Sequence, residues 1–298
     1  MGGRRYTLGK MTLLPAPPVA ALPPEAGVEA LASLLQGRRV VVLTGAGCST
    51  ESGIPDYRGP ETRHKVRNPI QHREFLHRSE VRARYWSRSL LGWPRFTSAR
   101  PNEAHFALAA LEKAGVVPGL ITQNVDGLHH AAGSERVLEL HGALSRVRCL
   151  SCQAQEPRAS VQARMLGLNP DFVHTAVELR PDGDAELPPE AMADFRVPAC
   201  TRCGGTLKPD VVFFGDNVAA PLVQDAFALV EEGDALLVVG SSLTVYSGYR
   251  FVTRAAERHV PIGILNLGES RGDSLADVRV EARAGDVLPR LAQRLTGG

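Results

Sequence analysis

Short apolar segments recur along the chain, and each one ends in small or polar residues. Residues 38–43, 119–121, 137–140, 235–239 and 262–265 are rich in aliphatic and β-branched side chains and are too short for core helices. They are followed by Thr-Gly, Thr-Gln-Asn, His-Gly, Gly-Ser-Ser and Asn-Leu-Gly in turn. Runs of this kind are typical of strands buried on both faces of a parallel sheet.

Helical patterns lie between several of these segments. Residues 28–36 predict a short helix, and residues 102–114 predict another with Asn102 as its N-cap. Alternating strands and helices predict an α/β fold with a doubly wound, Rossmann-like parallel sheet. Ligands of such sheets bind outside the carboxyl ends of the strands, so the polar strand ends indicate a ligand crevice, although any one strand can simply end in a turn.

Two stretches interrupt the alternation. Residues 59–100 are rich in Arg and His and predict a helical insertion, whereas residues 146–208 are polar, proline-bearing and typical of a small inserted module. Residues 1–24 are basic and proline-rich, which favours a flexible leader over a targeting peptide because the prolines disfavour an amphipathic helix. The organised domain is therefore expected to span residues 25–298.

Composition and charge narrow the function classes. The 298 residues are 44% hydrophobic with a formal net charge of +2, which argues against disorder and gives a nucleic-acid partner no support. No apolar run approaches the roughly 20 residues that a membrane span needs. We therefore expect neither a nucleic acid nor a membrane as partner.

Four of the five cysteines form two C-x-x-C pairs, Cys149 with Cys152 and Cys200 with Cys203. An odd total argues against a secreted disulfide framework and favours a reducing compartment, so we expect a cytoplasmic protein. Two such pairs supply four soft ligands to one structural Zn²⁺, while a redox-active dithiol needs only one pair. Cys48 stands apart and is expected to pack rather than to act as a nucleophile.

A glycine-rich turn at residues 45–50 directly follows the first strand. Its backbone N–H groups and the next helix can face a pyrophosphate. The match is incomplete because Thr50 stands where the dinucleotide fingerprint has its third glycine, so the turn alone is equally consistent with an ordinary tight turn. The polar loop after it carries Arg58, where a simple Rossmann unit continues into helix.

Polar residues at two further strand ends are candidates for chemistry. Asn124 can hold a water or a ribose hydroxyl, and Asp126 can accept hydrogen bonds from a carboxamide or, alternatively, cap a helix. His141 is the best general-base candidate, because an imidazole can take a hydroxyl proton near neutral pH. A purely structural histidine is the alternative.

Taken together, the motifs resemble the sirtuins, NAD-dependent protein deacylases. The motifs that carry the resemblance are G-A-G-C-S-T-E-S-G-I-P-D-Y-R-G at 45–59, T-Q-N-V-D-G-L-H at 122–129, L-E-L-H-G at 138–142, K-P-D-V-V-F-F-G at 208–215 and the two cysteine pairs. The resemblance runs from about residue 25 to the C-terminus. The phrases at 84–88, 92–94, 239–251 and 264–268 are most similar to class II, which holds mitochondrial sirtuin 4 and bacterial relatives.

The resemblance implies an NAD site built from four polar segments, with Asp126 on the nicotinamide carboxamide. The residues that it assigns to NAD are Gly45, Ala46, Gly47, Ser49, Glu51, Pro55, Asp56, Tyr57, Arg58, Gln123, Asn124, Val125, Asp126, Gly240, Ser241, Ser242, Asn266, Leu267, Gly268 and Ala284.

The resemblance also implies the reaction. The acyl oxygen of an acyl-lysine attacks C1′ of the nicotinamide ribose, nicotinamide leaves, and water completes release of lysine and O-acyl-ADP-ribose. His141 is implied to be the general base, with Asn124 and Asp126 as further catalytic residues. Acyl-lysine proteins or peptides are the expected substrates, deacetylase or lipoamidase chemistry the expected type, and a monomer the expected state. An extended substrate would pair with Val211, Val212, Phe213 and Phe214.

The acyl group is a separate question. Tyr85 and Arg88 have the Tyr-x-x-Arg spacing seen in sirtuins that prefer acidic acyl groups, and residues three apart share a helix face. A surface arginine beside a core tyrosine is the slightly favoured alternative.

Three other functions compete with deacylation. A protein mono-ADP-ribosyltransferase would use the same NAD site and is the main alternative. An NAD dehydrogenase is disfavoured by the missing third glycine. A nucleic-acid-binding zinc ribbon at residues 146–208 is disfavoured because acidic residues balance its arginines and no aromatic platform is present.

Overall fold

The computed structural model describes residues 19–57, 59, 62, 69–172, 192 and 194–297. Its larger part is a six-stranded sheet in the order β3-β2-β1-β7-β8-β9, with every neighbouring pair parallel. The strands are β1 (Val40–Thr44), β2 (Leu120–Thr122), β3 (Val137–Glu139), β7 (Ala235–Val239), β8 (Ile262–Leu265) and β9 (Val278–Val280). The apolar segments of the sequence form the first five of these in chain order.

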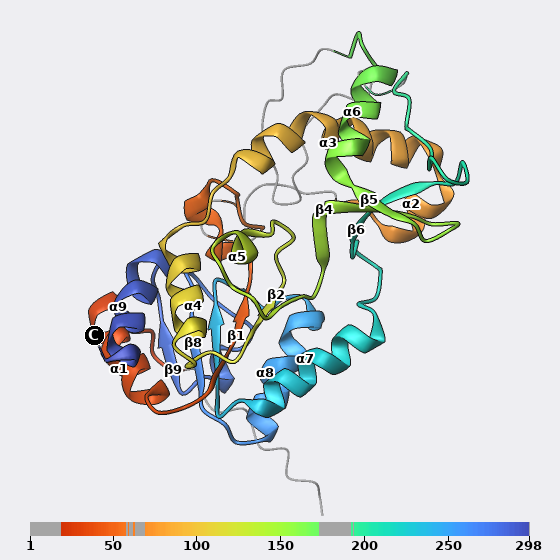
Figure 1. The fold of residues 1–298 in the computed structure, drawn as a ribbon. Helices are drawn as coiled ribbons and strands as arrows, with labels where there is room; N and C mark the ends of the chain where they lie inside the picture. The colour runs from red at the N-terminus through yellow and green to blue at the C-terminus, as the bar shows by residue number, and fades with distance from the viewer. Residues whose placement is uncertain are drawn as a thin grey trace, which may run out of the picture.

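Helices cover both faces of this sheet, as the doubly wound prediction requires (Figure 1). Strand β1 shows why: Val40 and Val42 pack into the core on one face, while Val41 and Leu43 pack into the core on the other, because side chains alternate along a strand. One face is covered by α1 (Pro24–Leu35), α4 (Glu103–Lys113) and α9 (Ala284–Thr296), the other by α7 (Ala220–Glu232) and α8 (Tyr246–Glu257).

The two interruptions of the pattern fold together as one small lobe, at the upper right of Figure 1. Phe75 and Trp86 from the first interruption share a hydrophobic core with Val147 and Val161 from the second. The lobe contains α2 (His72–His77), α3 (Ser79–Ser98), α6 (Arg158–Leu168) and an antiparallel sheet in the order β5-β4-β6, formed by β5 (Gln155–Pro157), β4 (Gly142–Cys149) and β6 (Leu207–Val211). The helical insertion and the inserted module are therefore one packed unit.

The N-terminal helix starts earlier than the pattern predicts. Helix α1 begins at Pro24, because proline lacks an N–H and suits the first turn of a helix. Just before it, Leu22 pairs with Val280 beside strand β9. The C-terminal part of the predicted leader thus contacts the large sheet, while residues 1–18 lie outside the described residues.

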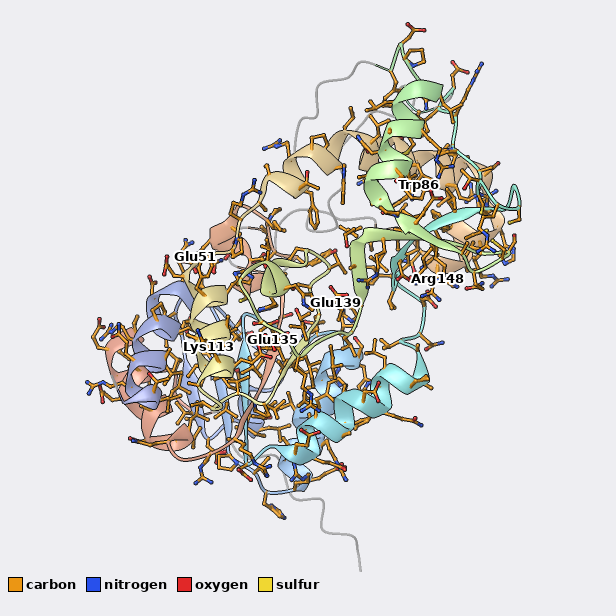
Figure 2. The ribbon with its side chains drawn as sticks, viewed as in Figure 1. Glu51, Trp86, Lys113, Glu135, Glu139 and Arg148 are labelled. Atoms are coloured by element: carbon orange, nitrogen blue, oxygen red, sulfur yellow. The ribbon has the colours of Figure 1, made fainter. Side chains whose placement is uncertain are left out.

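An ion pair joins the small lobe to the large sheet at Glu139, which Figure 2 labels below β4. Arg146 of β4 reaches Glu139 at the end of β3, with 2.8 Å between Nη2 and Oε2, and also Asp210 of β6, with 3.2 Å between Nε and Oδ2. Arg148 holds the second oxygen of Asp210 at 3.1 Å.

The remaining short helices are α5 (Leu128–Ala131), η1 (Ala46–Cys48), η2 (Thr50–Ser52) and η4 (Asp273–Leu275). Within the described ranges, no helix is long and apolar enough to cross a membrane.

Helix α4 supplies a stability test. Asn102 Oδ1 accepts hydrogen bonds from the N–H groups of Ala104 at 3.0 Å and His105 at 3.4 Å, and Asn102 Nδ2 donates to the Cys48 carbonyl at 2.9 Å. We expect Asn102→Ala to lower the free energy of unfolding by about 1–2 kcal/mol, since N-caps contribute about that much. Urea unfolding measures it. Asn102→Asp keeps the cap acceptor and should lose less; equal losses in the two variants would contradict the capping role.

Candidate functional site

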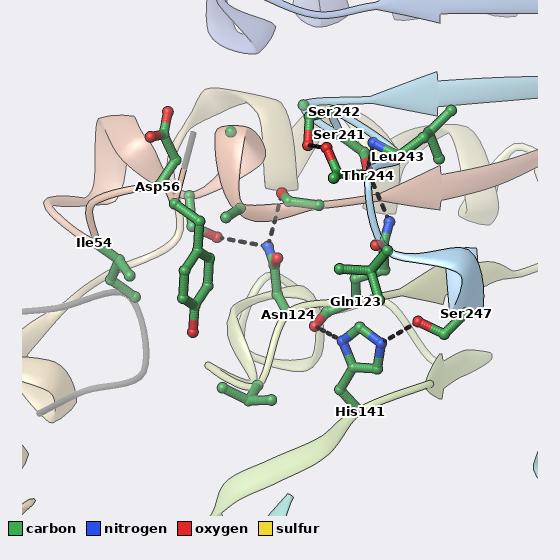
Figure 3. A pocket seen from close by; sticks show the side chains of 18 of the residues that line it. Ile54, Asp56, Gln123, Asn124, His141, Ser241, Ser242, Leu243, Thr244 and Ser247 are labelled. Carbon is green, nitrogen blue, oxygen red and sulfur yellow. Dashed lines mark hydrogen bonds between the residues drawn. The ribbon is translucent and has the colours of Figure 1, made fainter. Parts of the chain in front are cut away.

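A single cavity of about 720 Å³ lies at the carboxyl ends of the large sheet and reaches the small lobe (Figure 3). Its walls come from the segments that follow β1, β2, β3, β6, β7 and β8. Strand order reverses direction between β1 and β7, which is where ligands bind in doubly wound sheets. The crevice predicted from the polar strand ends is present.

The glycines after β1 are required by a close approach to the end of β7. The N–H of Gly47 donates to the Gly240 carbonyl at 2.8 Å. A Cβ on Gly47 would lie 2.9 Å from Gly240 Cα, and a Cβ on Gly45 would lie 2.8 Å from the Gly240 oxygen. Only glycine fits both positions, so this turn is more than an ordinary tight turn.

A chain of hydrogen bonds forms a polar cradle beside this turn. Asn124 Nδ2 donates to the Gly45 carbonyl at 3.0 Å and to Ser49 Oγ at 3.1 Å, and Ser49 Oγ donates to Asp126 Oδ2 at 2.7 Å. The other oxygen of Asp126 accepts from the N–H of Leu128, the first residue of α5, at 2.9 Å, while Gly127 is the N-cap residue. Burial raises the pKa of Asp126, and these hydrogen bonds oppose that effect. Asp126 therefore bonds the first N–H of a short helix and also lines the cavity.

His141 lies at the junction of the two lobes, directly before β4. Its Nδ1 is 2.9 Å from the Gln123 carbonyl, and since a carbonyl can only accept, Nδ1 carries the hydrogen. Nε2 is 2.8 Å from Ser247 Oγ and holds the lone pair (Figure 3). Burial lowers the pKa of His141, the bond to Gln123 opposes that effect, and the charge of Arg250 adds to it. A neutral imidazole with its lone pair in the cavity is what a general base requires.

Most residues predicted for the site line this one cavity. They are Gly45, Ala46, Gly47, Ser49, Pro55, Asp56, Tyr57, Tyr85, Gln123, Asn124, Val125, Asp126, His141, Val211, Val212, Phe213, Phe214, Gly240, Ser241, Ser242, Asn266, Leu267 and Ala284.

Four predicted residues are not in the cavity wall. Arg58 lies outside the described residues. Glu51 accepts a hydrogen bond from the N–H of Gly285 at 2.8 Å and lines a separate surface hollow. The carbonyl of Gly268 accepts from neighbouring side chains, at 3.0 Å from Asn266 Nδ2. Arg88 is buried in α3.

The predicted substrate segment follows β6. The N–H of Val212 donates to the His141 carbonyl at 2.9 Å, so the main chain of this segment is tied to the predicted base. Phe213 packs against Tyr85, with 5.4 Å between ring centroids, at the small-lobe end of the cavity. Tyr85 is therefore placed beside the predicted acyl path, and Arg88 is placed away from its wall.

Some cavity residues were missed by sequence reasoning. Ser247 and Arg250 of α8 lie near His141, while Ile54, Ile70 and Leu144 add apolar surface. The first two belong to the stretch 239–251, of which only residues 240–242 were assigned to the site. No sequence signal marks Ser247, because its contact with His141 joins positions 106 residues apart.

The two cysteine pairs form one cluster in the small lobe. Cys149 Sγ is 3.5 Å from Cys203 Sγ, Cys152 Sγ is 3.8 Å from Cys200 Sγ, and all four sulfurs lie within 4.8 Å of one another. Sulfurs around a tetrahedral zinc with bonds of about 2.3 Å are about 3.8 Å apart, so the donor set fits. None of the four lines the cavity, which indicates a structural role.

Cys48 differs from the other cysteines. It is fully buried behind the glycine turn, and burial raises the pKa of its thiol well above the ordinary range. A thiol that stays protonated is a poor nucleophile, so the position favours packing.

Comparisons with known proteins identify the family. A model described as "Sir2 family" matches residues 45–247. The chain belongs to the Sir2 family. Over 279 residues it is 50% identical to the human "NAD-dependent protein lipoamidase sirtuin-4, mitochondrial", covering 93% of this chain and 88% of that protein. It is also 51% identical over 256 residues to an "NAD-dependent protein deacetylase" of Xanthomonas campestris pv. campestris (strain 8004), covering 86% and 87%.

Solved sirtuin structures share the fold. One described as "Sir2-p53 peptide-NAD+" has 30% sequence identity and a TM-score of 0.71, covering 91% of this chain and 97% of that one. Another, "Structure of Sir2Tm bound to a propionylated peptide", has 29% identity and a TM-score of 0.70. The sequence prediction of a sirtuin with a Rossmann-like sheet and a cysteine module is confirmed.

Proposed function

We infer that this sirtuin is an NAD-dependent protein deacylase acting on acyl-lysine side chains. The observation that carries the inference is His141, a half-buried neutral imidazole whose lone pair faces the same cavity as the cradle of Asn124, Ser49 and Asp126. The names of its relatives, lipoamidase, deacylase and deacetylase, describe the same class of activity.

The cavity suits NAD. When bound, NAD supplies a ribose C1′ that is activated by nicotinamide as a leaving group. We propose that Asp126 binds the nicotinamide carboxamide, that Asn124 and Ser49 hold the adjoining ribose, and that Ser242 and Asn266 face the adenosine half. Gly45 and Gly47 let the turn after β1 pack against Gly240 and thereby hold the turn in the cavity wall, where we propose that the pyrophosphate binds.

Residues of the protein itself carry out the remaining steps. His141 takes the proton of a ribose hydroxyl at Nε2 while Nδ1 stays bonded to Gln123, so the ring keeps its orientation during the transfer. The acyl-lysine peptide is proposed to pair with residues 211–214 as an added strand, which presents the acyl group to the cavity beside Tyr85 and Phe213. A solved relative is described with both a peptide and NAD, which supports a peptide as the kind of substrate.

The mono-ADP-ribosyltransferase alternative is not favoured. Relatives with deacylase, lipoamidase or deacetylase in their names match this chain over most of their own length. Deacylation yields O-acyl-ADP-ribose and the transferase yields ADP-ribosylated protein, so mass spectrometry of the products separates the two reactions.

Location and assembly stay predictions. The human and bovine relatives carry "mitochondrial" in their names, so the expected cytoplasmic location has no support from them. A monomer without a nucleic-acid partner remains the expectation from the sequence.

Substitution of the base tests the function. His141→Gln should lower formation of O-acyl-ADP-ribose from acetyl- or lipoyl-lysine peptide and NAD by about 10²–10⁴-fold, the usual contribution of a general base. Mass spectrometry of the products measures it, with NAD binding as the control for folding. Undiminished turnover would refute the role of His141, and ADP-ribosylated protein as the main product would favour the transferase.

We propose that the cysteine cluster holds one structural Zn²⁺. Cys203→Ser should reduce bound zinc from about one per chain to near zero and lower the melting temperature, because structural sites need all four ligands. Elemental analysis measures the metal, and Cys48→Ala should keep it. Full zinc in Cys203→Ser would contradict this assignment.

We also propose that Tyr85 and Arg88 select acidic acyl groups: Tyr85 lines the cavity, and Arg88, which is buried in α3, must turn toward the cavity to reach the acyl carboxylate. Arg88→Ala should slow glutaryl-lysine cleavage about tenfold, since hydrogen bonds to charged groups contribute about 1.5–3 kcal/mol, and leave the acetyl-lysine rate unchanged. Arg95→Ala, at an exposed position of the same helix, is the control. An unchanged glutaryl rate means that Arg88 is structural.

A further inference from the structure

Two side chains of α8 face His141 and have no part in the reaction described above. Ser247, in the first turn of α8, places Oγ 2.8 Å from His141 Nε2 (Figure 3). Arg250, one turn later, also lines the cavity, and its charge acts on His141. Ser247 is only 9% exposed, so bulk water does not replace this contact readily.

The direction of the Ser247 hydrogen bond follows from the other side of the ring. Nδ1 donates to the Gln123 carbonyl, so Nε2 has only a lone pair and the Ser247 hydroxyl is the donor. That lone pair is the one that receives a proton when His141 acts as a base. Ser247 therefore donates to the same lone pair that must accept the ribose proton.

We propose that Ser247 is a positioning residue for His141, donating to Nε2 while the imidazole is neutral and accepting from Nε2–H once it is protonated. The inference rests on the proposed deacylase function. A hydroxyl is one donor and two acceptors, so rotation about Cβ–Oγ changes its role without moving heavy atoms. The proton goes from the ribose hydroxyl to Nε2, Nδ1 keeps its own hydrogen, and Ser247 keeps its own.

This change of the Ser247 hydroxyl from donor to acceptor stabilises the protonated His141 ring relative to the neutral ring. An imidazolium N–H donating to an oxygen makes a charge-assisted bond, which is stronger than the neutral bond to Nε2. Ser247 should therefore raise the proton affinity of His141, whereas burial and the positive charge of Arg250 lower it.

The charge of Arg250 is not neutralised nearby. It lies over the Tyr246 ring at 5.3 Å, and in the part of the chain that the structure describes no carboxylate pairs with it. Glu139, two residues before His141, is already paired with Arg146. The other charged residues of the cavity wall are Asp56, Asp126, Asp216, Glu269 and Arg283.

Ser247→Ala tests the proposal by the pH dependence of two quantities. The first is the acid limb of the kcat profile, and the second is the titration of the His141 ring, followed by NMR in the substrate-free protein. The apparent pKa of each should fall by about one pH unit. At pH 7, kcat should fall roughly three- to tenfold as the base weakens, with KM for NAD nearly unchanged. Arg250→Met should move the His141 titration upward.

Two variants are matched controls. Ser247→Thr keeps the hydroxyl and should restore the wild-type titration. Thr253→Ala removes a hydroxyl from the same helix, where Thr253 Oγ1 donates to the Arg250 carbonyl at 2.8 Å outside the cavity, and should leave the titration unchanged.

An unshifted His141 titration in Ser247→Ala would overturn the proposal, and so would an upward shift. The ring titration needs no substrate, so it separates this proposal from the proposed function. If the wild-type protein releases no nicotinamide with any acyl-peptide, the deacylase function fails while the role of Ser247 at His141 is still measured.

Discussion

The site depends on one backbone contact, where the turn after β1 meets the end of β7. Gly47 donates to the Gly240 carbonyl, and no side chain fits between the two strands at this level. The same contact brings the loops after both strands to one point of the sheet, at its reversal of strand order. Asn124 then reaches the Gly45 carbonyl and fixes the loop after β2 to the same turn. A bulkier residue at these glycines would separate three walls of the cavity at once.

The second constraint is the junction between the lobes. His141 stands between the last residues of β3, in the large sheet, and β4, in the small lobe, and its carbonyl accepts the N–H of Val212. Arg146 of the small lobe pairs with Glu139 of the large sheet, two residues before His141, and its second partner, Asp210, lies in the small lobe. The base and the proposed substrate segment are thus tied together, and the bond from His141 Nδ1 to the Gln123 carbonyl ties the base to the loop after β2 as well.

Local patterns predicted the local parts of this arrangement. The buried strands are apolar runs that end in polar residues, so β1, β2, β3, β7 and β8 could be located, and with them Asn124, Asp126 and His141. Strand β9 escaped notice because Arg279 interrupts its three residues. The union of both interruptions into one lobe, and the contact of Ser247 with His141, join distant positions that no local period encodes. Arg88 was expected from spacing alone, and spacing does not say which face of α3 meets the cavity.

Several polar side chains of the cavity hydrogen-bond to one another. Asn124 bonds Ser49, Ser49 bonds Asp126, Gln123 bonds Ser241, and His141 bonds Ser247. Buried polar groups need such partners, so these hydrogen bonds fix the orientations of the side chains in the site. Side-chain pairs can exchange one partner for a ligand atom, whereas bonds to the main chain, such as that from Nδ1 of His141 to Gln123, hold the orientation. The division between exchangeable and fixed hydrogen bonds therefore lets the reacting atom become free while its ring stays in place.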